Sequence, residues 1–345
     1  MSFQHSESSL IEGKLHILGP DDGPNSLKII DPELIRELKT SVLSFWPNRK
    51  NDFFPGPLPV SLERKNFYKL RQFPYLVCVK SDGLRFIMLR HNKNIYLVDR
   101  SFTFYNVSLN FQESNNFGVE FMLDGELIKT KDNQWTYIAH DCISIYCKDI
   151  SASNFDQRYE AVLTIINDIF IKEGSDFNII AKKFYKFNEI DTLISMLNNN
   201  KINHSIDGLI FTPLTLGIGT QTQFTLFKWK TRLHHTFDLK IVDNEEVHRY
   251  DAYANQGTTD KLFGSVDKNT KEGAQFIKLL KQKCPTFKSG DIVELDFNDK
   301  TKCFEPLIVR TDKSHPNSLF TIEKTLKNIE ENITLDELVN IIKNK

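Results

Sequence analysis

One stretch of the sequence, residues 75–86 (YLVCVKSDGLRF), constrains the fold more than any other. An apolar, β-branched run leads into Lys80, and a second apolar run follows the turn-forming residues Ser81, Asp82 and Gly83. The pattern predicts a β-hairpin that places the lysine at the mouth of a sheet. For an isolated K-x-D-G sequence a solvated surface hairpin is the usual structure. The choice between a reactive and a solvated lysine therefore depends on the rest of the chain.

The length and composition are typical of a two-domain globular protein. The chain has 345 residues, of which 40% are hydrophobic and 26% are charged, and domains usually contain roughly 100–200 residues. The 44 Lys and Arg residues nearly balance the 45 Asp and Glu residues. A nucleic-acid partner would have to bind a local basic surface, because the overall field does not attract it.

The termini and the cysteines indicate the cellular setting. Residues 1–10 contain no basic segment followed by an apolar one, and no apolar run approaches the length of a membrane span. We therefore expect neither a signal peptide nor a membrane segment. The cysteines lack C-x-x-C spacing and lie mostly in strand-like runs; they are Cys78, Cys142, Cys147, Cys284 and Cys303. This usage predicts a reduced, intracellular protein with buried thiols.

Apolar periodicity predicts strands and helices in the first part of the chain, after residues 1–30, for which it predicts no element. Asp31-Pro32 is typical of an N-cap followed by Pro at the first helical position, and Asn154 of a second N-cap. The expected helices run from Pro32 to before Pro47, near residues 62–70, from Asn154 to a closing Gly174, and near 190–197. The expected strands lie near residues 95–107, 120–130, 135–139, 143–147, 205–212 and 223–230.

After His234-His235 the sequence changes to short strands joined by polar loops. Strands near residues 237–242, 292–297 and 304–310, with one helix near 271–283, favour a small barrel such as an OB-fold. We therefore predict an α+β domain of residues 1–236 with mostly antiparallel sheets, and an OB-fold domain of residues 237–318. The tail, residues 319–345, is expected to be helical, with a capping box at Thr334 and Glu337 and an apolar face that packs back on the first domain.

Short motifs follow Lys80 in a fixed order, and each has an ordinary structural explanation when taken alone. D-G-E and D-G-L-I are common turn sequences, K-W-K is common on a solvated strand around a core tryptophan, and R-T-D-K suits a solvated turn. The motifs are residues 123–127 (LDGEL), 137–144 (YIAHDCIS), 206–210 (IDGLI), 227–230 (FKWK) and 309–313 (VRTDK).

The residue types in these motifs suit phosphoryl chemistry. On a strand, Lys228 and Lys230 would present both ammonium groups on one face. There they could contact a phosphate and, by like-charge repulsion, help keep the amine of Lys80 uncharged. Glu126 and Asp207, with Asp124 behind them, are the candidate ligands of a divalent cation. Carboxylate oxygens suit Mg²⁺ or Mn²⁺.

Together the motifs resemble those of covalent nucleotidyltransferases, the superfamily of mRNA capping enzymes and polynucleotide ligases. The ending EPLIVRTDKSHPN and the lead-in PGPLPVSLERKNF are similar to capping enzymes, and the tail IEKTLKNIEENITLDELV is similar to the compact chlorella virus form of that family. The resemblance extends from about residue 55 to the end. It implies a nucleotidyltransferase domain with antiparallel sheets and a C-terminal OB-fold lid.

The resemblance implies an mRNA guanylyltransferase reaction. The amine of Lys80 attacks the α-phosphorus of GTP, pyrophosphate leaves, and GMP remains on the lysine. The 5′-diphosphate end of an RNA then takes the GMP to give GpppRNA. Dividing one transfer into two displacements is covalent catalysis.

The resemblance also implies residue roles. Arg85 and Arg100 match ribose contacts. Ser81, with Asp82 and Gly83 in the same loop, and Lys183 match positions around the base, although Lys182 and Lys186 lie in the same segment. His140 stands where the viral relative stacks a phenylalanine on guanine; imidazole stacks more weakly. Arg310, Asp312 and Lys313 would reach the β- and γ-phosphates when the second domain closes.

Two other functions remain open from the sequence. A polynucleotide ligase would adenylylate Lys80, and a non-catalytic module would bind nucleic acid through the OB-fold. Neither an H-C-x5-R motif nor a Gly-rich cofactor loop occurs in the sequence. An RNA triphosphatase and a cap methyltransferase are therefore expected to be separate partners, with RNA polymerase components as further candidates. The expected location is the nucleus for a cellular protein and the infected host cell for a viral one.

Overall fold

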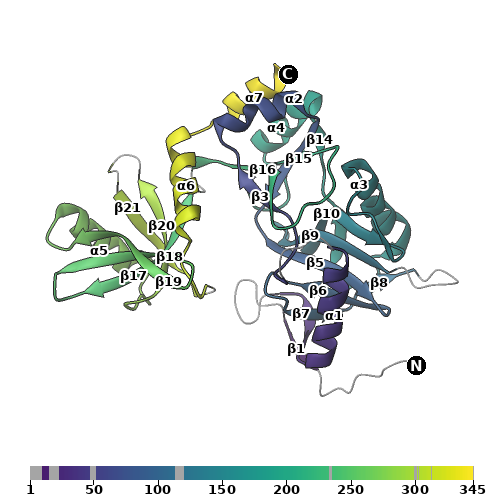
Figure 1. The fold of residues 1–345 in the computed structure, drawn as a ribbon, viewed down its shortest axis with the longest axis horizontal. Helices are drawn as coiled ribbons and strands as arrows, with labels where there is room; N and C mark the ends of the chain where they lie inside the picture. Colours follow the sequence, from purple (N-terminus) through teal and green to yellow (C-terminus); the bar gives the residue numbers. More distant parts are fainter. Residues whose placement is uncertain are drawn as a thin grey trace. The chain divides into compact units, whose positions relative to one another are not determined.

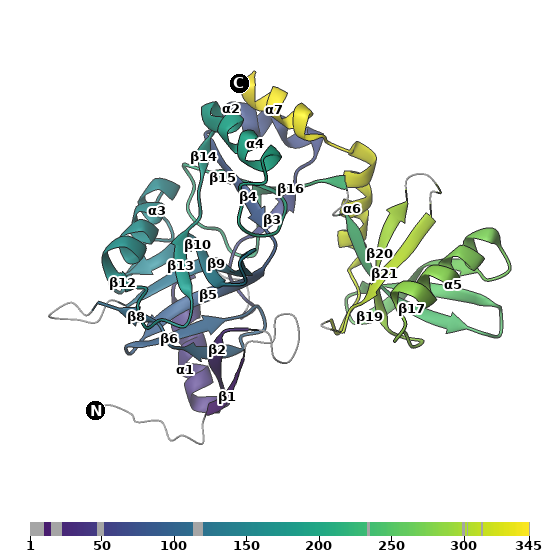
Figure 2. The same cartoon turned by 180° about the vertical axis from the view of Figure 1, so that it is seen from behind.

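The computed structural model of the chain describes residues 10–14, 23–46, 52–112, 120–232, 235–298, 301, 303–311 and 313–344. It contains two compact units (Figures 1 and 2). Unit 1 consists of Met1–Val60, Phe67–Trp229 and Val339–Lys345, and unit 2 of Ser61–Asn66 and Lys230–Leu338.

The larger sheet of unit 1 has the strand order β1-β2-β7-β6-β5-β9-β10-β11, and β13 pairs with β10 in parallel. The neighbours along this order pair antiparallel where the register is given, as in β5 with β6 and β9. The bounds are β1 Leu10–Lys14, β2 Asn25–Ile29, β5 Leu84–His91, β6 Asn94–Val98, β7 Phe104–Val107, β9 Phe121–Lys129, β10 Trp135–Ile145, β11 Lys148–Asp149 and β13 Asn178–Ala181.

A second sheet has the order β14-β4-β15-β16-β3, and β4 pairs antiparallel with β14 and β15. Strands β8 and β12 form a separate two-stranded sheet. The bounds are β3 Leu58–Ser61, β4 Tyr75–Ser81, β14 Tyr185–Lys186, β15 Ile206–Pro213, β16 Thr222–Lys230, β8 Asn110–Phe111 and β12 Phe170–Ile171.

Helices cover both faces of the larger sheet. Helix α1 (Pro32–Ser44) packs Leu34 and Leu38 against Ile87 and Leu89 of β5, and helix α3 (Phe155–Thr164) packs on the opposite face with Phe86 and Met88. The apolar run of β5 is continuous because both of its faces are buried. Asp31 caps α1 by accepting the Glu33 N–H at 2.9 Å, as predicted.

The predicted Lys80 hairpin is wrong, because β4 and β5 belong to different sheets. The Asp82 N–H donates to the Ser205 carbonyl at 2.9 Å, and a Cβ on Gly83 would lie 2.5 Å from the Leu127 carbonyl oxygen. The chain therefore crosses from one sheet to the other in this tight turn. Lys80 lies at the crossing.

Other predicted elements are confirmed with corrections. The two runs at 135–139 and 143–147 form one strand, β10, and residues 1–30 contain β1 and β2. The helix after Asn154 continues as a π-helical turn to Ile169, so Gly174, at φ +73°, lies in the turn beyond it. The helix near 62–70 divides into a 3-10 turn (Arg64–Asn66) and α2 (Phe67–Gln72), while α4 (Ile190–Asn198) agrees. Pro47 and His234 lie outside the described residues.

Unit 2 contains a five-stranded antiparallel sheet with the order β19-β18-β17-β20-β21. This order agrees with the predicted OB-fold topology. Phe263 of β19 and Phe304 of β21 come from the two ends of this order, yet their rings lie 6.3 Å apart, so the sheet is strongly curled. The bounds are β17 Thr236–Asn244, β18 Arg249–Gln256, β19 Thr259–Asp267, β20 Ile292–Asn298 and β21 Cys303–Val309.

In the described part of the chain after β16, the α-helices are α5 (Lys271–Lys283), α6 (Leu319–Glu331) and α7 (Leu335–Lys343). The apolar periodicity of the sequence does not predict the β18–β19 hairpin, because its strands are largely polar and partly exposed. The predicted cap of α7 is confirmed, with the Glu337 N–H donating to Thr334 Oγ1 at 3.2 Å. No helix in the described ranges is long and apolar enough to cross a membrane.

Gly125 in β9 gives a test of this packing. A Cβ at Gly125 would lie 2.4 Å from the Tyr137 ring and 2.7 Å from the Ile138 carbonyl oxygen. We expect Gly125→Ala to lower the free energy of unfolding of unit 1 by about 1–3 kcal/mol. Urea unfolding followed by tryptophan fluorescence measures this, because Trp46, Trp135 and Trp229 all belong to unit 1.

The matched control is Gly219→Ala, where the nearest atom to an added Cβ is a flexible glutamine side chain at 3.4 Å. This control should change the unfolding free energy by less than about 0.5 kcal/mol. Equal stability of the Gly125 and Gly219 variants would contradict the tight packing of β9 on β10.

Candidate active site

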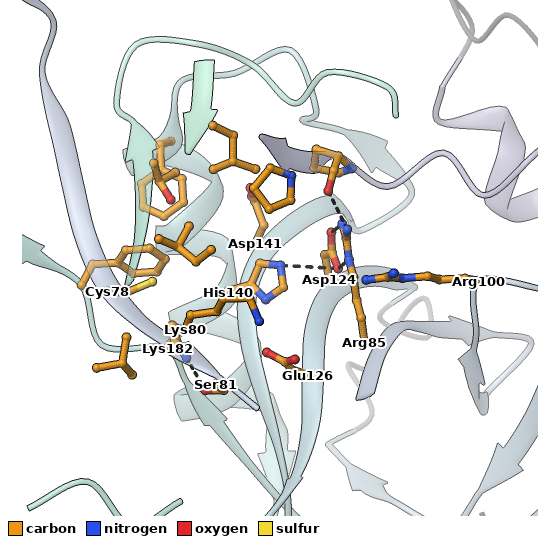
Figure 3. A pocket seen from close by; sticks show the side chains of 18 residues that line it. Cys78, Lys80, Ser81, Arg85, Arg100, Asp124, Glu126, His140, Asp141 and Lys182 are labelled. Atoms are coloured by element: carbon orange, nitrogen blue, oxygen red, sulfur yellow. Dashed lines mark hydrogen bonds and ion pairs between the residues drawn. The ribbon is translucent and has the colours of Figure 1, made fainter. Parts of the chain in front are cut away.

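A pocket in unit 1 lies where side chains of the two sheets face one another (Figure 3), with about 830 Å³ of space including its mouth. Strands β4, β5, β9, β10 and β15 all contribute to its lining. The polar members are Lys80, Ser81, Arg85, Arg100, Asp124, Glu126, His140, Asp141, Lys182 and Thr212. Six predicted site residues that are scattered along the sequence therefore come together here: Lys80, Ser81, Arg85, Arg100, Glu126 and His140.

Lys80 forms an ion pair with Asp207 across the pair of strands β4 and β15. Its Nζ lies 2.9 and 3.0 Å from the two carboxylate oxygens. Asp207 is the extra residue of a β-bulge, since Ile206 pairs with Ser81 and Gly208 with Lys80. Bulges redirect side chains next to functional sites. The sequence D-G-L-I is therefore not a turn but an irregularity within β15 that points the carboxylate at the lysine.

His140 occupies a second bulge of the same kind. Ala139 pairs with Gly125 and Asp141 with Asp124, so His140 is the extra residue of β10. Its Nε2 lies 3.5 Å from Asp124 Oδ1, and a third of its side chain is exposed at the pocket. The imidazole is thus available for contact with a ligand.

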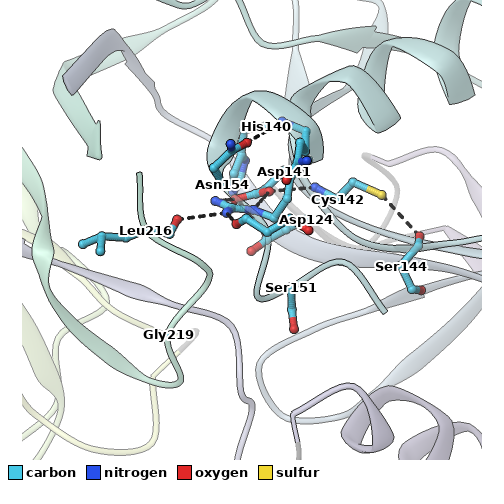
Figure 4. A network of polar contacts seen from close by, with 12 residues as sticks. Asp124, His140, Asp141, Cys142, Ser144, Ser151, Asn154, Leu216 and Gly219 are labelled. Atoms are coloured by element: carbon cyan, nitrogen blue, oxygen red, sulfur yellow. Dashed lines mark hydrogen bonds and ion pairs between the residues drawn. The ribbon is translucent and has the colours of Figure 1, made fainter. Parts of the chain in front are cut away.

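Arg158 of α3 fixes the chain next to this bulge. Its Nε lies 2.8 Å from Asp141 Oδ1, its Nη2 3.1 Å from Oδ2, and its Nη1 3.0 Å from the Leu216 carbonyl oxygen. Figure 4 shows Asp141 and Leu216 in this network, with His140 beside it. A buried ion pair of this kind, with its remaining donors satisfied, holds the backbone of the bulge in one place.

Asp124 is a buried ion-pair partner and not a turn residue, because D-G-E lies within β9. Arg85 Nε donates to Asp124 Oδ1 at 2.8 Å, its Nη2 contacts Oδ2, and its Nη1 donates to the Pro57 carbonyl at 2.5 Å. Burial alone raises the pKa of Asp124, but the charges of Arg85 and His140 outweigh it and hold that pKa well below the ordinary value. Arg85 is therefore largely occupied by protein partners.

Glu126 and Asp207 are the carboxylates with the chemistry of a metal site. Burial raises the pKa of Glu126, while Lys80, Lys182 and His140 oppose that rise. A divalent cation would relieve the cost of burying these two carboxylates. Within the described ranges no group of three or more His, Cys, Asp or Glu side chains is placed to hold a metal. The charges of Glu126 and Asp207 interact, and a divalent cation can be held by one or two carboxylates when phosphate and water complete its ligands.

Lys182, and not Lys183, lines the pocket. Lys182 is buried and donates to Ser81 Oγ at 2.5 Å, whereas Lys183 Nζ lies 5.0 Å from the centre of the Tyr185 ring. Burial lowers the pKa of Lys182. Successive residues of an extended segment point in opposite directions. The sequence could not decide the register, because both lysines follow β13 directly.

The other predicted residues of unit 1 lie as follows. Arg100 lines the pocket, while Asp82 is exposed and contributes its backbone N–H to the turn. Leu226, Lys228 and Lys230 are every second residue of β16, so the three share one face of the strand. Leu226 lines the pocket. The motifs do not predict the apolar walls of the pocket, which include Pro57, Pro59, Phe155 and Phe184.

The predicted cations of unit 2 converge on one buried carboxylate. Arg310 Nη1 lies 2.9 Å from Asp238 Oδ1 and 3.4 Å from Glu294 Oε2, and Lys313 also pairs with Asp238. Arg310 and Lys313 line a pocket of unit 2 together with Lys240 and Lys288. The predicted Asp312 lies outside the described residues.

Two mainly antiparallel sheets around a lysine-centred pocket, followed by an OB-type unit, define a nucleotidyltransferase. The family model for the mRNA capping enzyme catalytic domain matches residues 26–232, and the model for the mRNA capping enzyme C-terminal domain matches residues 222–339. The chain belongs to the mRNA capping enzyme family.

Curated relatives agree with this assignment. The mRNA-capping enzyme subunit alpha of Schizosaccharomyces pombe is 26% identical, over 88% of this chain and 83% of that protein. The mRNA-capping enzyme of Caenorhabditis elegans is 24% identical over 84% of this chain, which spans only 49% of that protein. Among solved structures, mycobacterial DNA ligase D with ATP aligns with 77% of this chain and 97% of that chain, at 13% identity and a TM-score of 0.41.

The Arg85–Asp124 pair can be tested through stability. The Asp124 side chain is 1% exposed and that of Arg85 10%, and removing one partner of a buried pair typically costs about 3–5 kcal/mol. We expect Asp124→Asn to destabilise unit 1 by this amount at pH 7. Because the folded-state pKa of Asp124 lies below its unfolded value of about 3.9, the contribution is fully present above that value. It is lost as the pH falls towards the folded-state pKa.

Urea unfolding at a series of pH values checks this expectation through tryptophan fluorescence. The difference between the wild type and Asp124→Asn should be largest near neutral pH and should shrink below about pH 4. Asp168→Asn is the control, since Asp168 is exposed on the π-helical turn. A difference that is independent of pH would show that the ion pair is not its source.

Proposed function

We propose that this chain is an RNA guanylyltransferase that carries GMP on Lys80. The observation that supports this most strongly is the position of Lys80. It lies where the chain crosses between two sheets, in a pocket that combines paired carboxylates, buried cations and a partly exposed imidazole. GTP is the proposed donor and RNA with a 5′-diphosphate end the proposed acceptor.

In the first step the Lys80 amine attacks the α-phosphorus of GTP. A P–N bond forms, the P–O bond to the bridging oxygen of pyrophosphate breaks, and one amine proton passes to water as the phosphoramidate forms. The Nζ of Lys80 is held by Asp207, so Lys80 has to leave this carboxylate before it can act as a nucleophile on the α-phosphorus. The bulge at Asp207 therefore keeps Lys80 in this ion pair until the nucleotide binds.

Fixed charges would stabilise the transition state. Lys182 is buried in the pocket, and Lys228 and Lys230 lie on the strand face that carries Leu226. Cations held in place before the reaction are the main source of stabilisation for phosphoryl transfer. Glu126 and Asp207 would hold Mg²⁺ or Mn²⁺, which would supply further positive charge to the phosphate oxygens when bound.

The nucleoside would occupy the rest of the pocket. Arg100 is the more available of the two predicted ribose contacts, because Arg85 already binds Asp124 and Pro57. His140 would stack on the base, and Ser81 with Lys182 would contact its polar edge. Here Lys182 takes the part that the resemblance implied for Lys183, because only Lys182 faces the pocket.

In the second step the terminal phosphate oxygen of the RNA attacks the phosphorus of the lysyl-GMP. A P–O bond forms, the P–N bond breaks, and Lys80 regains its proton. Arg310, Asp312 and Lys313 would act only in the first step, at the β- and γ-phosphates. In this structure Arg310 and Lys313 both pair with Asp238. A triphosphate would have to compete with that carboxylate.

The setting of the enzyme is also proposed. RNA triphosphatase and cap methyltransferase activities would come from partner proteins, and RNA polymerase components would bring the chain to nascent RNA. A cellular protein of this kind would act in the nucleus, and a viral one in the infected cell.

Lys80 gives the direct test. We expect wild-type protein incubated with α-labelled GTP to form a covalent adduct whose GMP maps to Lys80 by mass spectrometry, and Lys80→Ala to form none. Lys69→Ala is the control, since Lys69 lies on α2 and contacts the Phe224 carbonyl. An adduct with ATP alone would identify a ligase, and no adduct with either nucleotide would favour a non-catalytic nucleic-acid-binding module.

Lys313 tests the proposed role of unit 2. We expect Lys313→Ala to slow formation of the GMP adduct by about 10- to 100-fold, since a charged hydrogen bond contributes about 1.5–3 kcal/mol. Transfer of GMP from a purified adduct to RNA should change less than about threefold. Single-turnover assays of each half-reaction measure this, with Lys278→Ala on the exposed face of α5 as the control. A Lys313→Ala protein that forms the adduct at the wild-type rate would exclude this role.

A further inference from the structure

Ser81 and Lys182 line one part of the pocket, and two consecutive side-chain hydrogen bonds connect Lys182, Ser81 and His204. Lys182 Nζ is 2.5 Å from Ser81 Oγ, and Ser81 Oγ is 2.8 Å from His204 Nε2. The Ser81 side chain and Lys182 are both buried, and both line the pocket, whereas His204 lies behind them. The resemblance to capping enzymes assigned no role to His204.

The direction of these hydrogen bonds follows from the groups involved. An ammonium group can only donate, so Ser81 Oγ accepts from Lys182. Among the described contacts of Ser81 Oγ, His204 Nε2 is the group able to accept the hydroxyl proton. A neutral imidazole with its proton on Nδ1 satisfies this arrangement. Burial, with the charges of Lys182 and Lys131, lowers the pKa of His204 to about 4, which agrees with a neutral ring.

His204 is held from both sides by backbone hydrogen bonds. The Lys131 N–H donates to the Asn203 carbonyl at 2.9 Å, and the Asp82 N–H donates to the Ser205 carbonyl at 2.9 Å. Lys131 follows the end of β9 in the larger sheet, and Asp82 follows β4 in the second sheet. The imidazole therefore has a fixed position relative to Ser81, which a side chain on an unsupported loop would not have.

We propose that His204 is a positioning residue for base selection, because it binds the hydroxyl proton of Ser81 and leaves only an acceptor lone pair of Ser81 directed to the ligand. Lys182 presents donors beside it. A base edge that places an acceptor next to a donor, as O6 and N1–H of guanine do, matches this pair. Adenine presents a donor at position 6 and an acceptor at N1, which is the reverse order. The inference deepens the proposed function and rests on it.

The test compares His204→Ala and His204→Gln with the wild type in adduct formation with labelled GTP and ATP. For His204→Ala we expect a KM for GTP about 3- to 10-fold higher, the effect of one hydrogen bond, with kcat changed less than twofold. The preference for GTP over ATP should fall by a similar factor. His204→Gln should restore both values, because its side-chain carbonyl can accept the Ser81 proton. Ser81→Ala should make the His204→Ala substitution silent.

His91→Ala is the matched control, because His91 contacts Glu37 away from the pocket. It should leave KM and nucleotide preference unchanged, and thermal unfolding should show that each variant is folded. Unchanged KM and preference in His204→Ala would overturn the inference while leaving the GMP adduct intact. Failure of His204→Gln to restore them would also overturn it, since packing alone would then explain the loss. Absence of any adduct in the wild type would instead reject the proposed function.

Discussion

The site depends on the crossing of the chain between two sheets directly after Lys80. The turn allows no larger residue than glycine at position 83, because the Leu127 carbonyl lies against it. The crossing is also held by the bond from Asp82 to Ser205. Since β4 and β5 join different sheets, side chains from both can face a common space. A simple hairpin would have left Lys80 at a solvated edge.

Two β-bulges then determine which polar side chains are directed toward that space. Regular pairing would place successive side chains on alternate faces, but the bulges at Asp207 and His140 depart from this rule. Buried ion pairs support each bulge or lie beside it: Lys80 with Asp207, Arg85 with Asp124, and Arg158 with Asp141. Such pairs cost desolvation energy, and their concentration around one pocket is the pattern expected of a functional site.

Predictions from the sequence are confirmed where interactions between neighbouring residues decide the structure. The caps at Asp31 and Asn154 and the capping box at Thr334 are confirmed, because each depends on a side chain and a backbone N–H only two or three residues away. The strands predicted near residues 120–130 and 205–212 are also confirmed, as β9 and β15, although the D-G-E and D-G-L-I sequences within them are typical of turns. Each of these strands pairs with a neighbour on both sides, so tertiary pairing overrides turn propensity.

The sequence by itself determined the kind of chemistry, because lysines, carboxylates and a histidine in ordered motifs carry their charge and hydrogen-bonding capacity into any fold. It also determined most of the helices and strands through their apolar periodicity. Only the tertiary structure decided that Lys182 and not Lys183 lines the pocket, that Asp124 binds Arg85, and that His204 supports Ser81. These outcomes depend on strand register and on contacts between residues distant in the chain, and a change of one residue in register reverses the direction of every side chain.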